Sequence, residues 1–274
     1  MILPPFLVEA LRDGLLVPYL GPRVLELVPE YSVPSTPEAL AARLTAKVSV
    51  PHKIRTRLTQ SAQFIENFKH RKTLVDLMNG AFAPEPVPSA LHRALARLAL
   101  PLVVDAWYDN AMVAALAERS DWGQVQGLSQ SEHFGTWTGW YDAAGASVPD
   151  PNRQWQTILY KPLGGQAPAG NYLVSDSDYV EVLTEIDIQT PIPAAVQGLR
   201  TGRQFLFLGC RFNDQLPRSF ARQIMKRSSD RHWAVLPHEP TRMEARFLAE
   251  QGIERIDMPL DAFADALCAA LEPA

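Results

Sequence analysis

The sequence predicts an α/β fold of the Rossmann-like kind, in which helices cover both faces of a mostly parallel sheet. Short apolar runs alternate with segments whose apolar residues recur at helical spacing, and unbroken apolar runs are typical of strands that are buried on both faces. The chain of 274 residues is 47% hydrophobic and 20% charged, which excludes disordered, collagen-like and coiled-coil proteins. That length is close to the upper limit for one hydrophobic core, so residues 1–274 are expected to form a single domain.

The N-terminal part is expected to contain one helix, one strand and a helical insertion. Residues 4–13 place their apolar side chains on one helix face, and a glycine follows them. Residues 15–20 are an apolar run that ends in a Gly-Pro turn. Pro18 argues against a strand there, because proline cannot donate a ladder hydrogen bond. The insertion is expected at about residues 37–85, with helices at residues 37–48 and 54–78.

The middle of the chain repeats the order of strand and helix and then departs from it. A serine caps an expected helix at residues 89–98, an apolar strand follows at residues 101–105, and residues 108–119 are expected to be helical. Residues 120–151 are rich in Gly, Ser, Gln and Trp and hold no long periodic run. We therefore expect short strands and loops there, in a Trp-rich insertion at about residues 120–155.

The C-terminal part alternates strands and helices most regularly, which favours a parallel sheet. A Ser-x-x-Asp sequence at residues 175–178 resembles a capping box and opens a helix. The remaining strands are expected at residues 155–160, 172–174, 204–209, 233–236 and 253–256. The last helices are expected at residues 214–226, 241–251 and 260–271.

Four of the expected strands end in residues that suit ligand binding. In an open parallel sheet, ligands bind beyond the carboxyl ends of the strands, where the amides at helix N-termini favour anions. The candidate ligand-binding residues at these ends are Gly21, Pro22, Arg23, Trp107, Asp109, Lys161, Leu163, Gly209, Arg211, Asn213 and Asp214.

These four strand ends resemble, in their order and surroundings, the motifs of the sirtuin superfamily. The match is nearest to the bacterial sirtuin-like domains that are found in phage-defence proteins, and it spans about residues 10–260. The resemblance implies a Rossmann-like fold and chemistry on NAD. The matching stretches are residues 20–25, 105–109, 161–164 with 175–179, and 207–214. His92 also lies in a helix that resembles the one such domains place before their second motif.

The positions that would carry the family's chemistry are changed in this sequence. The catalytic histidine of the resemblance falls on Leu163, which accepts no proton, and the asparagine that positions ribose and water falls on Trp107. In the first motif, Pro22 removes an amide donor and Arg23 fills the space that a glycine would leave. In the last motif a serine becomes Arg211. The resemblance therefore implies a relative without catalytic residues and without deacylase or NAD hydrolase activity.

Several of these side chains allow two interpretations. Arg23 and Arg211 would form an anion clamp for a phosphorylated nucleotide, or would pair with Asp109 or Asp214 and plug the crevice. Trp107 would stack on a ligand ring or fill the cavity that an absent cofactor leaves. Lys161 would touch a ligand or remain a solvated charge. The tryptophans of the loop-rich segment would form an exposed patch for a protein partner or a small core; they are Trp122, Trp137, Trp140 and Trp155.

Composition excludes several other classes of protein. The net charge is −4, so no overall basic field drives binding to nucleic acid or to an acidic membrane. The two cysteines stand far apart, and no two histidines are spaced as ligands on one helix face, so neither a disulfide framework nor a metal site is expected. The locally basic residues 52–57 and 225–227 are interpreted as solvated helix faces. No targeting or membrane segment is evident, and we expect a cytoplasmic protein.

The expected function is binding. The occupant would be a partner protein, a second copy of the chain, or a nucleotide held in a remodelled pocket, with NAD, NADP and ADP-ribose as the candidates, although no resident cofactor is expected. One alternative is an NAD-consuming hydrolase of a bacterial defence or regulatory system that uses Asp109, Asn110 or Asn213. Another is a structural subunit that docks through its Trp-rich segment.

Overall fold

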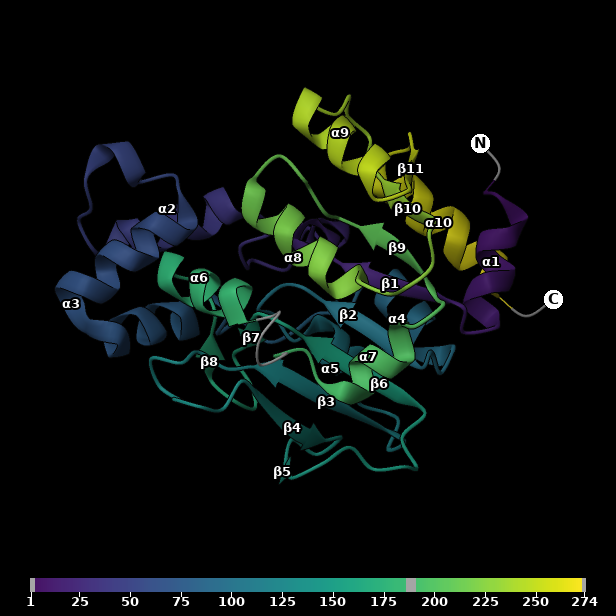
Figure 1. Ribbon diagram of the computed structural model, residues 1–274, viewed down its shortest axis with the longest axis horizontal. Coiled ribbons are helices and arrows are strands. Elements are labelled where there is room, and N and C mark those ends of the chain that lie inside the picture. The colour runs from purple at the N-terminus through teal and green to yellow at the C-terminus, as the bar shows by residue number, and fades with distance from the viewer. Residues whose placement is uncertain (1–2, 186–190, 273–274) are drawn as a thin grey trace.

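Nine strands form a central sheet, most of them parallel, in the computed structural model, which describes residues 3–185 and 191–272 (Figure 1). Their order across the sheet is β11-β10-β9-β1-β2-β6-β3-β4-β5, and only the pairings of β4 with β3 and with β5 are antiparallel. The sheet strands are β1 (Leu16–Leu20), β2 (Leu102–Asp105), β3 (Trp122–Gly127), β4 (Thr138–Asp142), β5 (Ser147–Val148), β6 (Thr157–Lys161), β9 (Gln204–Leu208), β10 (His232–Val235) and β11 (Ile253–Ile256). The short strands β7 (Gly164–Gly165) and β8 (Asn171–Tyr172) form a separate antiparallel pair.

Helices cover both faces of this sheet, as the sequence predicts. Along β9, Phe205 and Phe207 point into one buried cluster, whereas Leu206 and Leu208 point into the other. The second cluster contains side chains of α1 (Pro5–Arg12), α4 (Ala90–Arg97), α5 (Ala111–Leu116) and α10 (Leu260–Leu271). The first contains side chains of α2 (Pro37–Lys47), α3 (Leu58–Ala81), α6 (Asp176–Glu185), α7 (Ala194–Arg200), α8 (Gln215–Met225) and α9 (Arg242–Glu250). The 3-10 helices are η1 (Pro22–Leu27) and η2 (His52–Ile54).

Pro18 lies inside a central strand, despite the argument against it. Leu20 O accepts a hydrogen bond from Ala106 N (2.8 Å) at the β2 edge of β1. Because peptide groups alternate in direction along a strand, the nitrogen of Pro18 also faces β2. The pairing of β1 with β2 begins only at Tyr19, so the missing N–H falls just before that ladder.

The largest departure from the predicted elements is β3, which lies where loops and short strands are expected. All six of its residues are buried. Gln124 and Gln126 are 2% and 0% exposed, and Gln126 Nε2 donates to Gln124 Oε1 (2.8 Å). The sequence conceals this strand because its buried side chains include two glutamines, and glycines stand at two of its positions. Gln126 Nε2 also donates to Ala167 O (2.7 Å), and Gln126 Oε1 has no partner in the described part of the chain.

Smaller departures concern helix limits. The helix expected at residues 108–119 covers only Ala111–Leu116, because the preceding residues form the loop after β2. The strand expected at residues 172–174 is shorter and pairs with β7 outside the main sheet, and α7 is not expected at all from the sequence. The helix expected at residues 54–78 is α3, which is kinked where His70 adopts φ 70° and ψ 153°.

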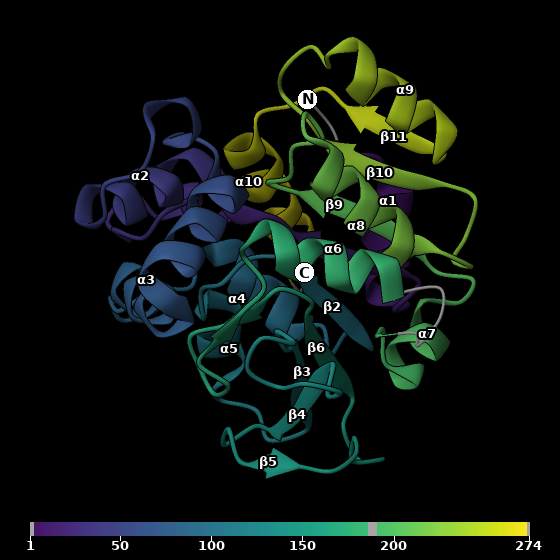
Figure 2. The same cartoon turned by 60° about the vertical axis from the view of Figure 1, so that its left-hand side comes forward.

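The helices α2 and α3 of the insertion pack against each other and form a projection at one end of the molecule, as Figure 2 shows. In the part of the chain that the structure describes, no helix is long and apolar enough to cross a lipid bilayer. The limits of the expected single domain stay a prediction.

Candidate functional site

The strand order reverses between β1 and β9, which is where an open α/β sheet forms its ligand crevice. The chain leaves β1 toward β2 on one side and leaves β9 toward β10 on the other. Gly21 directly follows β1, and Gly209 directly follows β9. The first and last of the four predicted motifs are therefore neighbours at this edge of the sheet.

The two loops are hydrogen-bonded to each other instead of leaving a crevice between them. Gly21 N donates to Leu208 O (2.8 Å), and Arg23 N donates to Gly209 O (3.1 Å). Val24 N donates to Gly21 O (3.2 Å), and Pro22 has no N–H. Every backbone amide from residue 21 to residue 24 is therefore engaged within the protein or absent, so none of the four is available to an anion.

The glycines of these loops serve the close packing of backbone on backbone. A Cβ on Gly21 would lie 2.7 Å from both Cys210 Sγ and Gly209 O. Gly209 has φ +66°, and a Cβ there would lie 2.5 Å from Val24 N. Burial raises the pKa of the Cys210 thiol, which keeps that side chain a neutral filler between the loops.

Each arginine of the predicted clamp pairs with a glutamate near it. Arg23 Nη1 lies 2.9 Å from Glu26 Oε1 on the surface of η1. Arg211 Nη2 lies 3.8 Å from Oε2 of Glu244, whose side chain is fully buried. Neither partner is one of the two aspartates named in the sequence analysis, so the expected pairing with Asp109 or Asp214 is wrong.

Those two aspartates cap helices. Asp109 is buried, and its Oδ1 accepts a hydrogen bond from Ala111 N (2.8 Å) at the start of α5. Asp214 is exposed, and its Oδ1 accepts from Leu216 N (3.0 Å) at the start of α8. Asn213 is exposed, whereas Asn110 is buried with no partner for its Oδ1 in the described part of the chain.

Lys161, at the end of β6, is fully buried and holds the loop that follows β2. Its Nζ donates to Asp105 Oδ2 (2.6 Å), Asp109 O (2.7 Å) and Trp107 O (3.1 Å). An ammonium group has three protons, so this set of acceptors occupies all of them. The interpretation of Lys161 as a solvated charge is therefore wrong, and the geometry also leaves it no proton for a ligand.

Trp107 and Leu163, on which the resemblance places the family's asparagine and histidine, both lie in the hydrophobic core. Trp107 is 4% exposed, stands with its ring centroid 4.9 Å from that of Tyr108, and donates from Nε1 to Pro34 O (2.8 Å). Leu163 is 7% exposed and its carbonyl accepts from Leu173 N (2.9 Å). These contacts support the interpretation of Trp107 as a filler.

Titratable side chains gather around the buried ammonium group of Lys161. Burial raises the pKa of Asp105, and Lys161 opposes that rise. Burial lowers the pKa of His92 to about 4. His92 Nδ1 accepts from Ser89 N (3.2 Å) in a capping box at the start of α4, so this histidine is neutral and serves the helix.

The tryptophans do not form one patch. Trp122 is 1% exposed and lies in the second cluster, together with α1 and α10. Trp137, Trp140 and Trp155 are partly buried at the margin of the first cluster. The rings of Trp140 and Trp155 have centroids 6.4 Å apart. Only these last three are placed where a partner could reach them.

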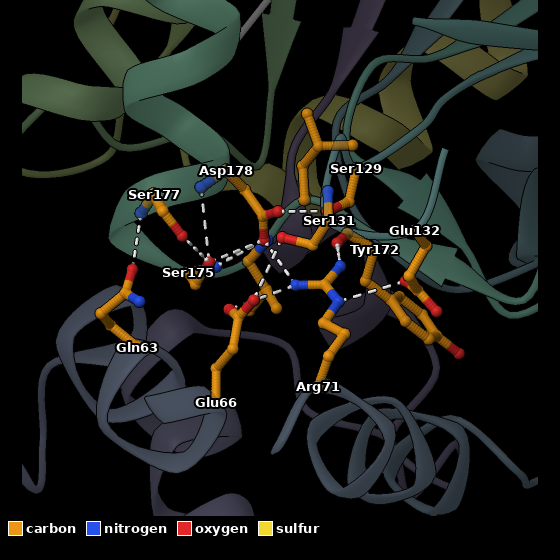
Figure 3. A network of polar contacts seen from close by, with 12 residues as sticks. Gln63, Glu66, Arg71, Ser129, Ser131, Glu132, Tyr172, Ser175, Ser177 and Asp178 are labelled. Atoms are coloured by element: carbon orange, nitrogen blue, oxygen red, sulfur yellow. Dashed lines mark hydrogen bonds and ion pairs between the residues drawn. The ribbon is translucent and has the colours of Figure 1, made fainter. Parts of the chain in front are cut away.

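A polar network that the sequence does not reveal joins the helical projection to the third motif (Figure 3). Asp178, on α6, has a fully buried side chain. It accepts from Arg71 Nη1 (2.9 Å), Ser129 Oγ (2.6 Å), Val174 N (2.9 Å) and Ser175 N (2.9 Å). Asp178, in the third motif, therefore connects α6 to α3 and to the loop that follows β3.

Arg71 extends this network to two further carboxylates. Its Nε donates to Glu132 Oε2 (3.1 Å), its Nη1 lies 3.5 Å from Glu66 Oε2, and its Nη2 donates to Tyr172 O. Arg71 directly follows the kink of α3, so the kink delivers the guanidinium group to the loop between β3 and β4. In the sequence, a single arginine within a helical segment does not indicate such a network.

Two hollows lie away from the four strand ends. One of about 410 Å³ is lined by Arg222, Lys226 and Asp230 among others, and a neighbouring one of about 460 Å³ by Arg231 and Glu254 among others. Among residues 3–185 and 191–272, no group of three or more His, Cys, Asp or Glu side chains could hold a metal ion.

Comparison with known families identifies what this arrangement is similar to. A family model described as the SIR2-like domain matches residues 101–256, which contain three of the four motifs. No curated protein matches the chain.

Proposed function

Because the chain belongs to the SIR2-like domain family, we propose that it is a member without NAD chemistry, which acts by binding a partner protein. The proposal concerns what the altered motifs do in place of catalysis. It rests on the same four strand ends that carry the resemblance.

The observation that carries the proposal is the closure of the first motif on the last. A pyrophosphate is bound by free backbone amides at a helix N-terminus. Here the amides of Gly21, Arg23 and Val24 donate within the protein, and Pro22 has none. The residues present therefore do not fit the pyrophosphate of NAD.

The positions of the reacting groups support the same conclusion. A positioned general base contributes roughly 10²–10⁴ in rate, and Leu163 supplies neither a base nor a hydrogen-bond acceptor in its side chain. Trp107 occupies its space with a ring whose one donor is already bound to Pro34 O. Lys161 and Asp109 are engaged in holding the fold.

A nucleotide in a remodelled pocket is the weaker candidate. The two arginines that would attract its phosphate are already paired with Glu26 and Glu244. A phosphate would have to compete with both carboxylates in a chain whose net charge is −4. We therefore place a partner protein first, with a second copy of the chain as one form of it.

Incubation of the purified protein with NAD, followed by chromatography for released nicotinamide, tests the loss of chemistry. The expected result is release no faster than in buffer. Release that is abolished in Asp109→Asn would overturn the proposal, since asparagine keeps an acceptor for Ala111 N and removes only the charge. Equal melting temperatures of the two proteins serve as the folding control.

A thermal-shift panel with NAD, NADP and ADP-ribose tests the nucleotide pocket. A ligand at about 100 times its Kd adds roughly 2.7 kcal/mol to the stability of the protein. We expect no shift with any of the three compounds. A shift that disappears in the variant Arg23→Gln/Arg211→Gln would favour the nucleotide instead.

A further inference from the structure

The helical projection is basic, in contrast to the rest of the chain. Residues 37–85 carry eight Lys and Arg against four Asp and Glu. The projection therefore has a net charge of +4, and the remainder of the chain has −8, since the whole chain has −4. Positive charge is thus in excess on the projection, and negative charge is in excess on the remainder of the chain.

The most concentrated positive charge lies between α2 and α3. Residues 47–57 contain no Asp or Glu, and their four cationic side chains are exposed: Lys47, Lys53, Arg55 and Arg57. Within the described residues, none of these four forms an ion pair. Figure 1 shows this stretch at the outer end of the projection, away from the sheet. Cations on a solvated helix face are commonly interspersed with carboxylates, which this segment lacks.

Two aromatic side chains continue this charged segment along one side of α3, called here its outer side: Phe68 is exposed, and Phe64 is partly buried against the first cluster. Residues 57, 60, 64 and 68 follow one another at three- and four-residue spacing, so they share one side of the helix. The rings of Phe64 and Phe68 have centroids 4.4 Å apart, and Phe68 is 66% exposed. Lys69 and Lys72 are exposed close by. An aromatic pair with a cationic rim has the composition of a protein-binding surface.

We propose that residues 47–57 and the outer side of α3 form a docking surface for an acidic segment of a partner protein that also carries apolar side chains. The carboxylates of the partner pair with the cations of residues 47–57, and its apolar side chains pack on Phe64 and Phe68. This inference rests on the proposed function in that it names the class of partner and the surface that receives it.

The charge division favours a short acidic protein segment over a nucleic acid. A polynucleotide that extends beyond the projection meets the remainder of the chain, whose net charge is −8, and is repelled there. A segment of a few residues contacts the projection alone. The rings of Phe64 and Phe68 also lie against each other, with an angle of 30° between their planes, and Phe64 packs partly on the first cluster. The two rings therefore offer less free surface to bases than two separate exposed rings would.

Binding of a defined acidic polymer to the full chain tests the surface. The probe is a fluorescent random copolymer of glutamate and tyrosine, measured by anisotropy beside polyglutamate and an oligothymidine DNA strand. We expect the copolymer to bind more tightly than the other two probes. Its binding weakens between about 0.1 M and 1 M salt, as the Debye length falls from about 10 Å to about 3 Å.

Two triple variants with equal charge change separate the surface from a general field effect. Lys53→Glu/Arg55→Glu/Arg57→Glu is expected to weaken copolymer binding by about tenfold or more, since each exposed pair contributes up to about 1 kcal/mol. The control Arg153→Glu/Arg227→Glu/Arg242→Glu changes exposed arginines on other elements and is expected to bind like the parent protein. Phe68→Ser is expected to weaken binding of the copolymer but not of polyglutamate.

Three results would overturn the inference: no binding of the copolymer, equal losses in the two triple variants, or tighter binding of the DNA strand. The last would assign the surface to nucleic acid. Release of nicotinamide from NAD would overturn the proposed function and leave these binding results unchanged, so the two failures are distinguishable.

Discussion

Replacing Lys161 with methionine removes the ammonium group that holds the loop after β2. In the parent protein, Lys161 Nζ contacts Asp105 Oδ2 at 2.6 Å, and both side chains are buried, at 0% and 5% exposure. The variant leaves a buried carboxylate without its counter-ion and two carbonyl groups, those of Trp107 and Asp109, without a donor. Methionine fills a similar volume, so the change isolates the electrostatic contribution.

The expected loss of stability is large. Removing one partner of a buried ion pair destabilises a protein by about 3–5 kcal/mol, against a total stability of about 5–15 kcal/mol. For a chain of this size, such a loss lowers the melting temperature by roughly 6 to 20 °C. Urea unfolding followed by circular dichroism measures the free energy, and a thermal scan measures the melting temperature.

The pH dependence of the loss tests the cause. Burial raises the pKa of Asp105 and Lys161 lowers it, so removal of the lysine leaves that pKa further above its unfolded value. A carboxyl group of this kind contributes stability at low pH that is lost as pH rises through its folded pKa. The deficit of Lys161→Met relative to the parent protein should therefore shrink as pH falls from 8 to 5.

The double variant Lys161→Met/Asp105→Asn provides the control, because it also removes the orphaned charge. It should recover at least about 1 kcal/mol relative to Lys161→Met at pH 8. A deficit below about 1 kcal/mol in the single variant, a deficit that does not change with pH, or a double variant no more stable than the single one would refute the reasoning.

Three further predictions concern the same core. Burial lowers the pKa of His92 to about 4, whereas in the unfolded chain its pKa is near 6.5. About 3 kcal/mol of the free energy of unfolding is therefore lost as pH falls from 6.5 to 4. In His92→Gln, the free energy of unfolding in urea should change less with pH over that range. Gly209→Ala places a Cβ 2.5 Å from Val24 N at φ +66° and should lower the free energy of unfolding in urea by more than about 2 kcal/mol. The control Gly202→Ala, at φ +71° with open space around it, should lower it by only about 1–2 kcal/mol. Equal losses in the two variants would contradict the close packing of the loops. Arg71→Met leaves Asp178 buried without its cation and should lower the free energy of unfolding by about 3–5 kcal/mol. Trypsin should also cleave residues 47–72 faster than in the parent protein. An unchanged digestion pattern would mean that the network does not anchor the projection.

Much of the fold is predictable because its signals are local. The runs that became β1, β2, β6, β9 and β10 are mostly apolar in the sequence, and helices between strands carry caps such as Ser89 and Thr241. β3 is not predicted because Gln124 and Gln126 are polar in the sequence, and the acceptors of Gln126 Nε2, which are Gln124 Oε1 and Ala167 O, become apparent only in the folded chain. The kink of α3 at His70 has no such local signal.

The position of the candidate residues at strand ends is predictable from the sequence, but their contacts are not. The four motifs name Gly21, Lys161, Leu163 and Arg211 correctly as residues at strand ends. Their partners are non-local, however: Lys161 is satisfied by a loop more than fifty residues away in the chain, and Arg211 pairs with Glu244 on α9. Periodicity and spacing along the chain do not reveal such contacts, so the sequence does not distinguish an open crevice from a closed one.

The sequence by itself determined the α/β class and the family resemblance, because these depend on residue type and order along the chain. Tertiary structure alone decided that the amides of residues 21–24 are engaged, that Lys161 is buried, and that residues 47–57, which contain no carboxylate, lie at the outer end of a projection. The physical reason is that hydrogen-bond satisfaction and burial depend on which atoms lie next to each other in space. In these cases the neighbouring atoms belong to residues that are distant in the chain.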